Sequence, residues 1–108
     1  AVKACVLSTK RAAGKEIVTV EGLSEAEREA FVYAFGKVGA VQCGFCTPGI
    51  IMTTQALLNK NPHPSEEEVR DALSGNYCRC ISHYHVFEAI ASLAGRGVDL
   101  DEKWRGRR

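Results

Sequence analysis

The stretch AVQCGFCTPG, residues 40–49, places two cysteines three positions apart among small and turn-forming residues. A second stretch, GNYCRC at residues 75–80, carries two more cysteines, separated by a single residue. A C-x-x-C pair is the spacing of a redox dithiol, of half a zinc site or of half an iron–sulfur site, and it also occurs as two inert thiols in a turn. The interpretation depends on whether the two stretches belong to one site.

The overall composition of the chain limits which kinds of protein and of cysteine site are expected. The chain has 108 residues, of which 45% are hydrophobic, so it suits one domain, with or without an appendage. A formal charge of +1 gives no reason to expect nucleic acid or a membrane surface as partner. No apolar run is long enough to span a bilayer, and no signal pattern opens the chain, so a cytoplasmic location is expected. Five cysteines with two close pairs favour a metal or redox site in a reducing compartment over a secreted disulfide scaffold.

The first part of the chain has the character of strands. KACVLST and KEIVTV are short and rich in β-branched residues, and Gly14 between them can make a turn, which predicts a β-hairpin. A two-stranded hairpin is marginal alone, so it would need a sheet or a helical body to lie against. The chain opens without Met inside one of these runs, which indicates a fragment or a processed product.

Helical periodicity replaces the strand pattern at Ser24. A glutamate follows three residues later, which is a capping box, and apolar residues then recur at helical spacing until Gly39. This pattern predicts a helix over residues 24–38. Thr47, followed directly by proline, has the sequence of a helix N-cap and predicts a second helix over about residues 47–59.

Two further helices are expected in the second half. Ser65 begins another capping box with three glutamates, which predicts a short helix that Gly75 ends. Apolar spacing predicts a fourth helix over about residues 83–94, ended by Gly95. The polar residues 96–108 are expected to be extended. Both cysteine pairs then lie in loops.

These two loops should meet. The second and third helices are joined by a short turn and form an antiparallel pair, which brings both loops to one end of the bundle. Four thiolates at one point suit a zinc ion or an iron–sulfur cluster. A thioredoxin-like dithiol needs a βαβ context that the pattern lacks. Gly44, Gly49 and Gly75 let the backbone come close to such a centre, and the start of the second helix adds a positive dipole end. The candidate ligands are Cys43, Cys46, Cys78 and Cys80.

The motif QCGFCTPG together with GNYCRC resembles the C-terminal [2Fe–2S] domain of the iron–sulfur subunit of the molybdenum hydroxylases. That family includes xanthine dehydrogenase, aldehyde oxidoreductase and carbon monoxide dehydrogenase. The resemblance covers about the first 90 residues. It implies a mostly α chain with a four-helix [2Fe–2S]-binding domain at residues 23–95. A β-hairpin remnant of a plant-type ferredoxin-like domain would precede it at residues 1–22, and a polar tail would follow at residues 96–108.

The resemblance also implies roles for single residues. The four cysteines would hold the cluster nearest the molybdenum cofactor, with Gln42 beside the pterin. Gly44 would let the backbone approach the cluster, and Arg79, between two cysteines, would either add positive charge near the cluster or face the partner. Read without the resemblance, Gln42 is a loop amide and Arg79 a surface arginine. Cys5 would be the last ligand of a second [2Fe–2S] cluster, whose other three ligands are not in this chain. Alone it binds no cluster and is better read as a small buried hydrophobe.

One stretch departs from the family pattern. The family usually continues C-R-C with Thr-Gly-Tyr, whereas Ile81, Ser82 and His83 follow here. We expect His83 and His85 to begin the fourth helix, since the four cysteines already fill the site; the alternatives are donors that tune the cluster or a Rieske-like ligand. Trp104 and the arginines of the tail have the character of a docking arm or of a disordered end.

The predicted function is electron transfer within an oxidoreductase complex. The resemblance implies a molybdopterin-binding large subunit as partner, with an FAD-binding subunit and the missing ferredoxin-like segment as further partners. The complex would hydroxylate its substrate, and this chain would hold no substrate-converting residue. The alternatives are a zinc-stabilised four-cysteine interaction domain without redox activity and a stand-alone regulatory ferredoxin-like module.

Overall fold

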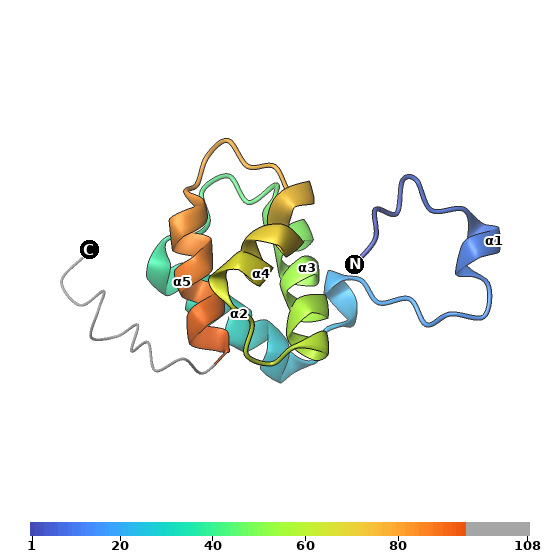
Figure 1. The fold of residues 1–108 in the computed structure, drawn as a ribbon, viewed down its shortest axis with the longest axis horizontal. Helices are drawn as coiled ribbons and strands as arrows, with labels where there is room; N and C mark the ends of the chain where they lie inside the picture. Colours follow the sequence, from blue (N-terminus) through green and yellow to red (C-terminus); the bar gives the residue numbers. More distant parts are fainter. Residues whose placement is uncertain (95–108) are drawn as a thin grey trace.

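A computed structural model describes residues 1–94, so the predicted polar tail with Trp104 lies outside the described residues. Within that range, helices pack into a body and the N-terminal residues form an arm beside it (Figure 1). The body contains α2 (Glu25–Val38), α3 (Thr47–Lys60), α4 (Glu66–Ala72) and α5 (His83–Leu93). These match the four predicted helices in order, which confirms the mostly α class.

The predicted β-hairpin is wrong. Residues 1–20 contain no strand; they hold the single-turn helix α1 (Thr9–Ala12), and the 3₁₀ turn η1 (Val20–Gly22) follows. Ser8 caps α1 by accepting the N–H of Arg11 at 3.3 Å. The lysine, arginine and alanines of this stretch form helix better than strand, and two strands without a sheet beside them are marginal. Local capping therefore decides the conformation.

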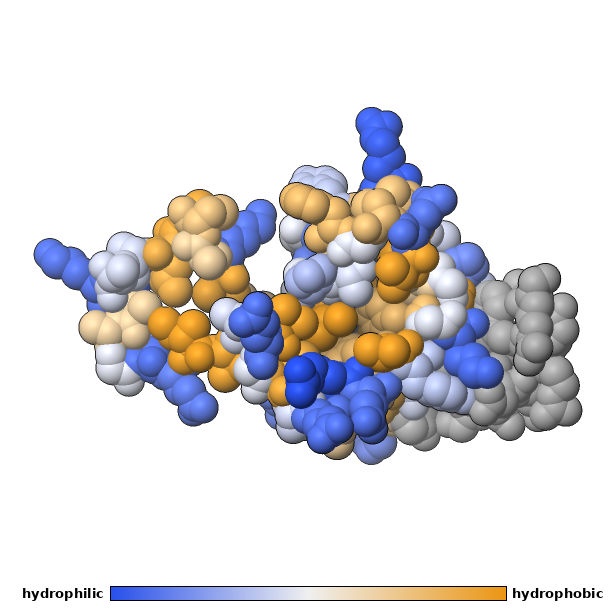
Figure 2. Space-filling model, turned by 180° about the vertical axis from the view of Figure 1, so that it is seen from behind, coloured by the Kyte–Doolittle hydropathy of each residue, from blue (hydrophilic) through white to orange (hydrophobic). Residues whose placement is uncertain are grey.

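Apolar side chains of the arm face solvent. The exposed fractions are 72% for Val2, 75% for Val6 and 67% for Ile17. Figure 2 shows the resulting hydrophobic surface on the arm, at the left in that view. Contiguous apolar surface of this kind marks a place that another surface covers.

Helix α2 is fixed at both ends by the predicted residues. The Ser24 hydroxyl accepts the N–H of Glu27 at 3.2 Å, and the Glu27 carboxylate accepts the N–H of Ser24 at 2.9 Å. At the other end Gly39 has a φ of +70°, the left-handed conformation that glycine adopts without strain. The capping box and the glycine stop read from the sequence are both confirmed.

Replacing Gly39 with alanine is expected to lower the free energy of unfolding by about 1–2 kcal/mol. The built Cβ would meet no atom within 4 Å, so the cost comes from the positive φ alone. Gly36→Ala is the matched control, because Gly36 lies inside α2 with open space around it and should gain about 0.5–1 kcal/mol. Urea unfolding of the metal-free chain measures the stability of the two variants. Stability changes of the same sign in Gly39→Ala and Gly36→Ala would contradict the role given to the positive φ.

The start of α3 differs by one residue from the prediction. Cys46, not Thr47, is the N-cap, while Thr47 is the first helical residue and Pro48 the second. The reason is that Cys46 already has helical dihedrals, φ −79° and ψ −15°, and its carbonyl accepts the N–H of Ile50 at 3.1 Å. The second cysteine of the C-x-x-C pair is thus part of the helix start.

The hydrophobic core lies between the helices. Helix α2 packs mainly against α5, and α3 packs against α4. No helix in the part of the chain described here is long and apolar enough to cross a membrane. The buried core consists of Leu23, Phe31, Ala34, Phe35, Val38, Ala40, Ile50, Val69, Leu73, Val86, Ala89 and Ile90.

Candidate metal centre

Both cysteine loops lie at the same end of the body. Residues 39–46 join α2 to α3, and residues 76–82 join the 3₁₀ turn η2 (Leu73–Gly75) to α5. The two loops run side by side at the top of Figure 1, and the Sγ atoms of Cys43 and Cys80 are 3.6 Å apart. The prediction that the two stretches form one cluster of thiols agrees with this arrangement.

The four thiols meet as two linked pairs. Cys43 lies against Cys80, Cys46 interacts with Cys78, and Cys78 also interacts with Cys80. Two thiolates on one tetrahedral ion, with metal–sulfur bonds of about 2.3 Å, stand about 3.8 Å apart, close to the spacing of the first pair. Among residues 1–94, no group of three or more His, Cys, Asp or Glu side chains is close enough together to hold a metal ion in the arrangement described. Pairs of this kind suit a centre with two metal ions.

Within each pair the metal-free thiols have shifted pKa values of opposite direction. A backbone N–H in its own loop lowers the pKa of Cys43, and the hydrogen bond to Cys43 raises the pKa of Cys80. The backbone N–H that follows Cys80 lowers the pKa of Cys78. Burial, together with the neighbouring Cys78 thiol, raises the pKa of Cys46 to about 11. Each pair thus joins one thiol with a lowered pKa to one with a raised pKa, because the two share a hydrogen bond.

Backbone groups and one side-chain hydroxyl surround the thiols. The N–H of Ile81 points at the Cys78 sulfur over 3.4 Å. Gly44 has a φ of +85°, which lets its loop turn back so that its carbonyl accepts the N–H of Thr47 at 3.3 Å. The Thr47 hydroxyl is buried and has no hydrogen-bond partner among the residues described. A buried hydroxyl directly after Cys46 could donate to a sulfur acceptor of a centre bound at these thiols.

The remaining predicted residues lie as follows. Gln42 is exposed and directly precedes Cys43. Arg79 is also exposed and lies between Cys78 and Cys80. His83 and His85 are in the first turn of α5, where they were expected as helix-start residues. Cys5 is exposed on the arm, so the expectation of a buried thiol is wrong; the apolar cover it would need is not supplied by the arm.

The sequence did not predict a hydrogen bond that joins the residues before Cys78 to helix α3. The Asn76 amide donates to the Thr53 hydroxyl over 3.1 Å, although the two residues are 23 positions apart. Neither residue was predicted to take part in the site: Asn76 directly follows the glycine that ends the third predicted helix, and Thr53 lies within the second. The sequence shows only a polar residue in each of two distant segments, and the packing of α3 against η2 brings them together.

A comparison with protein families matches residues 19–91 to the family described as the [2Fe–2S] binding domain. The chain belongs to this family. The donor set fits the family's cluster, because four cysteine thiols in two pairs, a buried unpartnered hydroxyl and a backbone N–H directed at a sulfur are present at one place.

Similar proteins narrow the type of [2Fe–2S] binding domain. The nicotinate dehydrogenase small FeS subunit of Eubacterium barkeri is 42% identical over 90 residues, which are 82% of this chain and 57% of the relative. The xanthine dehydrogenase iron-sulfur-binding subunit of Escherichia coli O157:H7 is 42% identical over 96 residues, 83% of this chain and 58% of the relative. The predicted resemblance to the iron–sulfur subunits of the molybdenum hydroxylases is confirmed.

A solved structure gives the same result for the fold. Quinoline 2-oxidoreductase from Pseudomonas putida 86 matches with a TM-score of 0.73 and 41% identity, over 89% of this chain and 63% of that chain. The chain therefore spans less than two-thirds of the length of the proteins it resembles.

Proposed function

We propose that this chain holds one [2Fe–2S] cluster and passes single electrons from a molybdenum centre on a partner subunit to a further acceptor. The observation that carries the proposal is the meeting of two cysteine loops at one end of the bundle, with two sulfurs only 3.6 Å apart. The proposed ligands are Cys43, Cys46, Cys78 and Cys80.

The pairing of the thiols suggests how they divide between the two metal ions. Cys43 and Cys80 would bind one iron, and Cys46 and Cys78 the other, so that each iron is held by one cysteine from each loop. When bound, the cluster supplies one-electron redox chemistry. Two groups of the chain would stabilise the negative charge of the cluster. One is the N-terminus of α3, a 14-residue helix, and the other is the backbone N–H of Ile81, which points at the Cys78 sulfur.

The cysteine end is suited to contact a redox partner. Cys43 and Cys80 are exposed, and the aromatic side chains of the two loops point outward, with exposed fractions of 94% for Phe45 and 90% for Tyr77. Exposed aromatics of this kind are common at interfaces. We assign this face to a molybdopterin-binding subunit, with Gln42 beside the pterin and Arg79 near the negative cluster.

The same proposal covers the other parts of the chain. Residues 23–95 would be the cluster domain, and residues 1–22 would belong to a ferredoxin-like domain in which Cys5 is a ligand of a second cluster. The exposed valines and isoleucine of the arm support this, because a covering domain would bury them. Substrate conversion would take place on the molybdopterin subunit, an FAD-binding subunit would accept the electrons, and the complex would be cytoplasmic.

Removing the Thr47 hydroxyl is expected to lower the reduction potential of the cluster. The hydroxyl is buried without a partner and follows a ligand cysteine, so it is available to donate to sulfur, and such a bond favours the more negative reduced state. Thr47→Val should shift the potential by about 40 mV to more negative values, the equivalent of one hydrogen bond of about 1 kcal/mol. A spectroscopic redox titration measures the shift. Thr47→Ser keeps the hydroxyl and should stay near wild type; equal potentials in both variants would contradict the assignment.

A redox titration also tests the proposed function itself. The chain is loaded with iron and sulfide under anaerobic conditions and titrated with dithionite while its visible absorption is followed. We expect a single one-electron transition that reoxidation reverses. A loaded chain whose absorption does not respond to reductant, or that loses its iron in the first reduction, would rule out electron transfer.

A further inference from the structure

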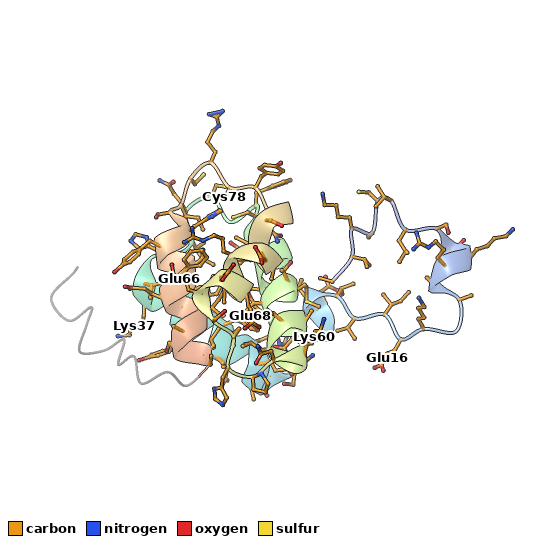
Figure 3. All side chains as sticks on the ribbon, viewed as in Figure 1. Glu16, Lys37, Lys60, Glu66, Glu68 and Cys78 are labelled. Carbon is orange, nitrogen blue, oxygen red and sulfur yellow. The ribbon has the colours of Figure 1, made fainter. Side chains whose placement is uncertain are left out.

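The side chain of Asn76 connects the two halves of the cysteine site. Asn76 lies two residues before Cys78, directly after η2, and its amide donates to the Thr53 hydroxyl over 3.1 Å. Thr53 is on α3, the helix whose N-cap is Cys46. One side-chain bond therefore fastens the loop of one cysteine pair to the helix that carries the end of the other. Figure 3 shows Cys78 at this end of the body.

Gly49 provides the space that this contact needs. A Cβ at Gly49 would stand 3.1 Å from the Asn76 amide oxygen, closer than an ordinary van der Waals contact. Gly49 and Thr53 are four residues apart on α3 and so lie on the same helix face. The Asn76 amide thus packs against the first two turns of α3. Its oxygen faces Gly49, and its nitrogen donates to the Thr53 hydroxyl.

We infer that Asn76, Thr53 and Gly49 form a latch that sets the distance between the two cysteine loops, and that Asn76 is a positioning residue for the metal centre. This inference rests on the proposed function, because it concerns how the chain holds the cluster. Each proposed iron takes one cysteine from each loop, so a displacement of one loop relative to the other stretches both pairs at once. Groups that orient metal ligands in this way change metal retention without touching the metal.

The two partners of Asn76 can be tested separately. Thr53→Val removes the hydroxyl while keeping the shape of the side chain, and Thr53→Ser restores it. Gly49→Ala keeps every hydrogen-bonding group but pushes on the amide oxygen. The 108-residue chain and its variants are loaded with iron and sulfide, and two quantities are measured: the rate of cluster loss to a chelator, and the visible circular dichroism of the cluster, which reports the placement of the sulfurs around it.

We expect Thr53→Val to lose the cluster roughly fivefold faster than wild type, as the loss of one hydrogen bond of about 1 kcal/mol implies. Gly49→Ala should also lose the cluster faster, because its Cβ displaces the Asn76 amide oxygen, and both variants should change the visible circular dichroism of the cluster. Thr53→Ser should behave as wild type. In Gly49→Ala every hydrogen-bonding group is kept and alanine favours the helix, so faster cluster loss in this variant would come from the displaced Asn76 amide. Gly36→Ala, where a Cβ meets nothing within 4 Å, is the matched control and should leave the cluster unchanged.

The outcomes distinguish this inference from the proposed function. If wild type holds a cluster, and both Thr53→Val and Gly49→Ala keep it at the wild-type rate with unchanged visible circular dichroism, the latch is wrong and the proposed function stands. If wild type takes up no cluster under conditions in which its helices are folded, the proposed function is wrong and the latch with it.

Discussion

Replacing Cys43 with alanine is expected to abolish stable cluster binding. Cys43 is one of the two thiols whose sulfurs lie 3.6 Å apart, and without it the iron that we assign to this pair loses one of its ligands. Changing a group that only orients a metal ligand costs 10–100-fold in affinity, so losing a ligand should cost more than about 100-fold. Iron content and visible absorption after anaerobic loading measure the effect.

The matched control for this prediction is Cys5→Ala. Cys5 is also an exposed thiol, but it lies on the N-terminal arm and not in the two loops. It should load to the wild-type level. Equal cluster content in the Cys43 and Cys5 variants would show that the cluster, if any, is not bound where we place it.

Replacing Phe35 with alanine is expected to lower the free energy of unfolding by about 3–5 kcal/mol, the usual cost of emptying the space of a buried aromatic ring. Phe35 is 2% exposed and lies in the centre of the core between α2 and α5. Its ring also meets that of Phe31 edge-on, with centroids 6.0 Å apart and an interplanar angle of 73°. For a domain of this size, such a loss is a large share of the total stability.

Urea unfolding of the metal-free chain, followed by far-ultraviolet circular dichroism, measures this loss. Val32→Ala on the same helix is the control, because Val32 is 74% exposed and its truncation should change stability by no more than about 0.5 kcal/mol. Similar losses in the two variants would mean that α2 does not bury the face assigned to it.

Local signals predicted most of the helical body. Ser24, Ser65 and Gly39 each act through groups within a few residues, so their effects can be read from the sequence, and the structure has the caps they predict. The meeting of the cysteine loops followed from a topological rule, since two antiparallel helices return the chain to the same end.

The errors have different physical causes. The strand pattern at the arm is intrinsic, but a strand needs a neighbouring strand, and the serine-capped turn at Thr9 forms without one. Thr47 has the sequence of an N-cap, yet the carbonyl of the preceding cysteine accepts the first helical bond. The bond between Asn76 and Thr53 crosses 23 residues, so only the packed structure reveals it.

The central claim is that the four cysteines hold a [2Fe–2S] cluster. Its most direct test is to purify the chain under anaerobic conditions, measure its metal and sulfide content, and record EPR spectra before and after dithionite. The account predicts a brown protein with about two iron and two sulfide per chain that becomes EPR-active on reduction. A colourless protein with about one zinc per chain and no EPR signal on reduction would contradict it and indicate a structural four-cysteine site.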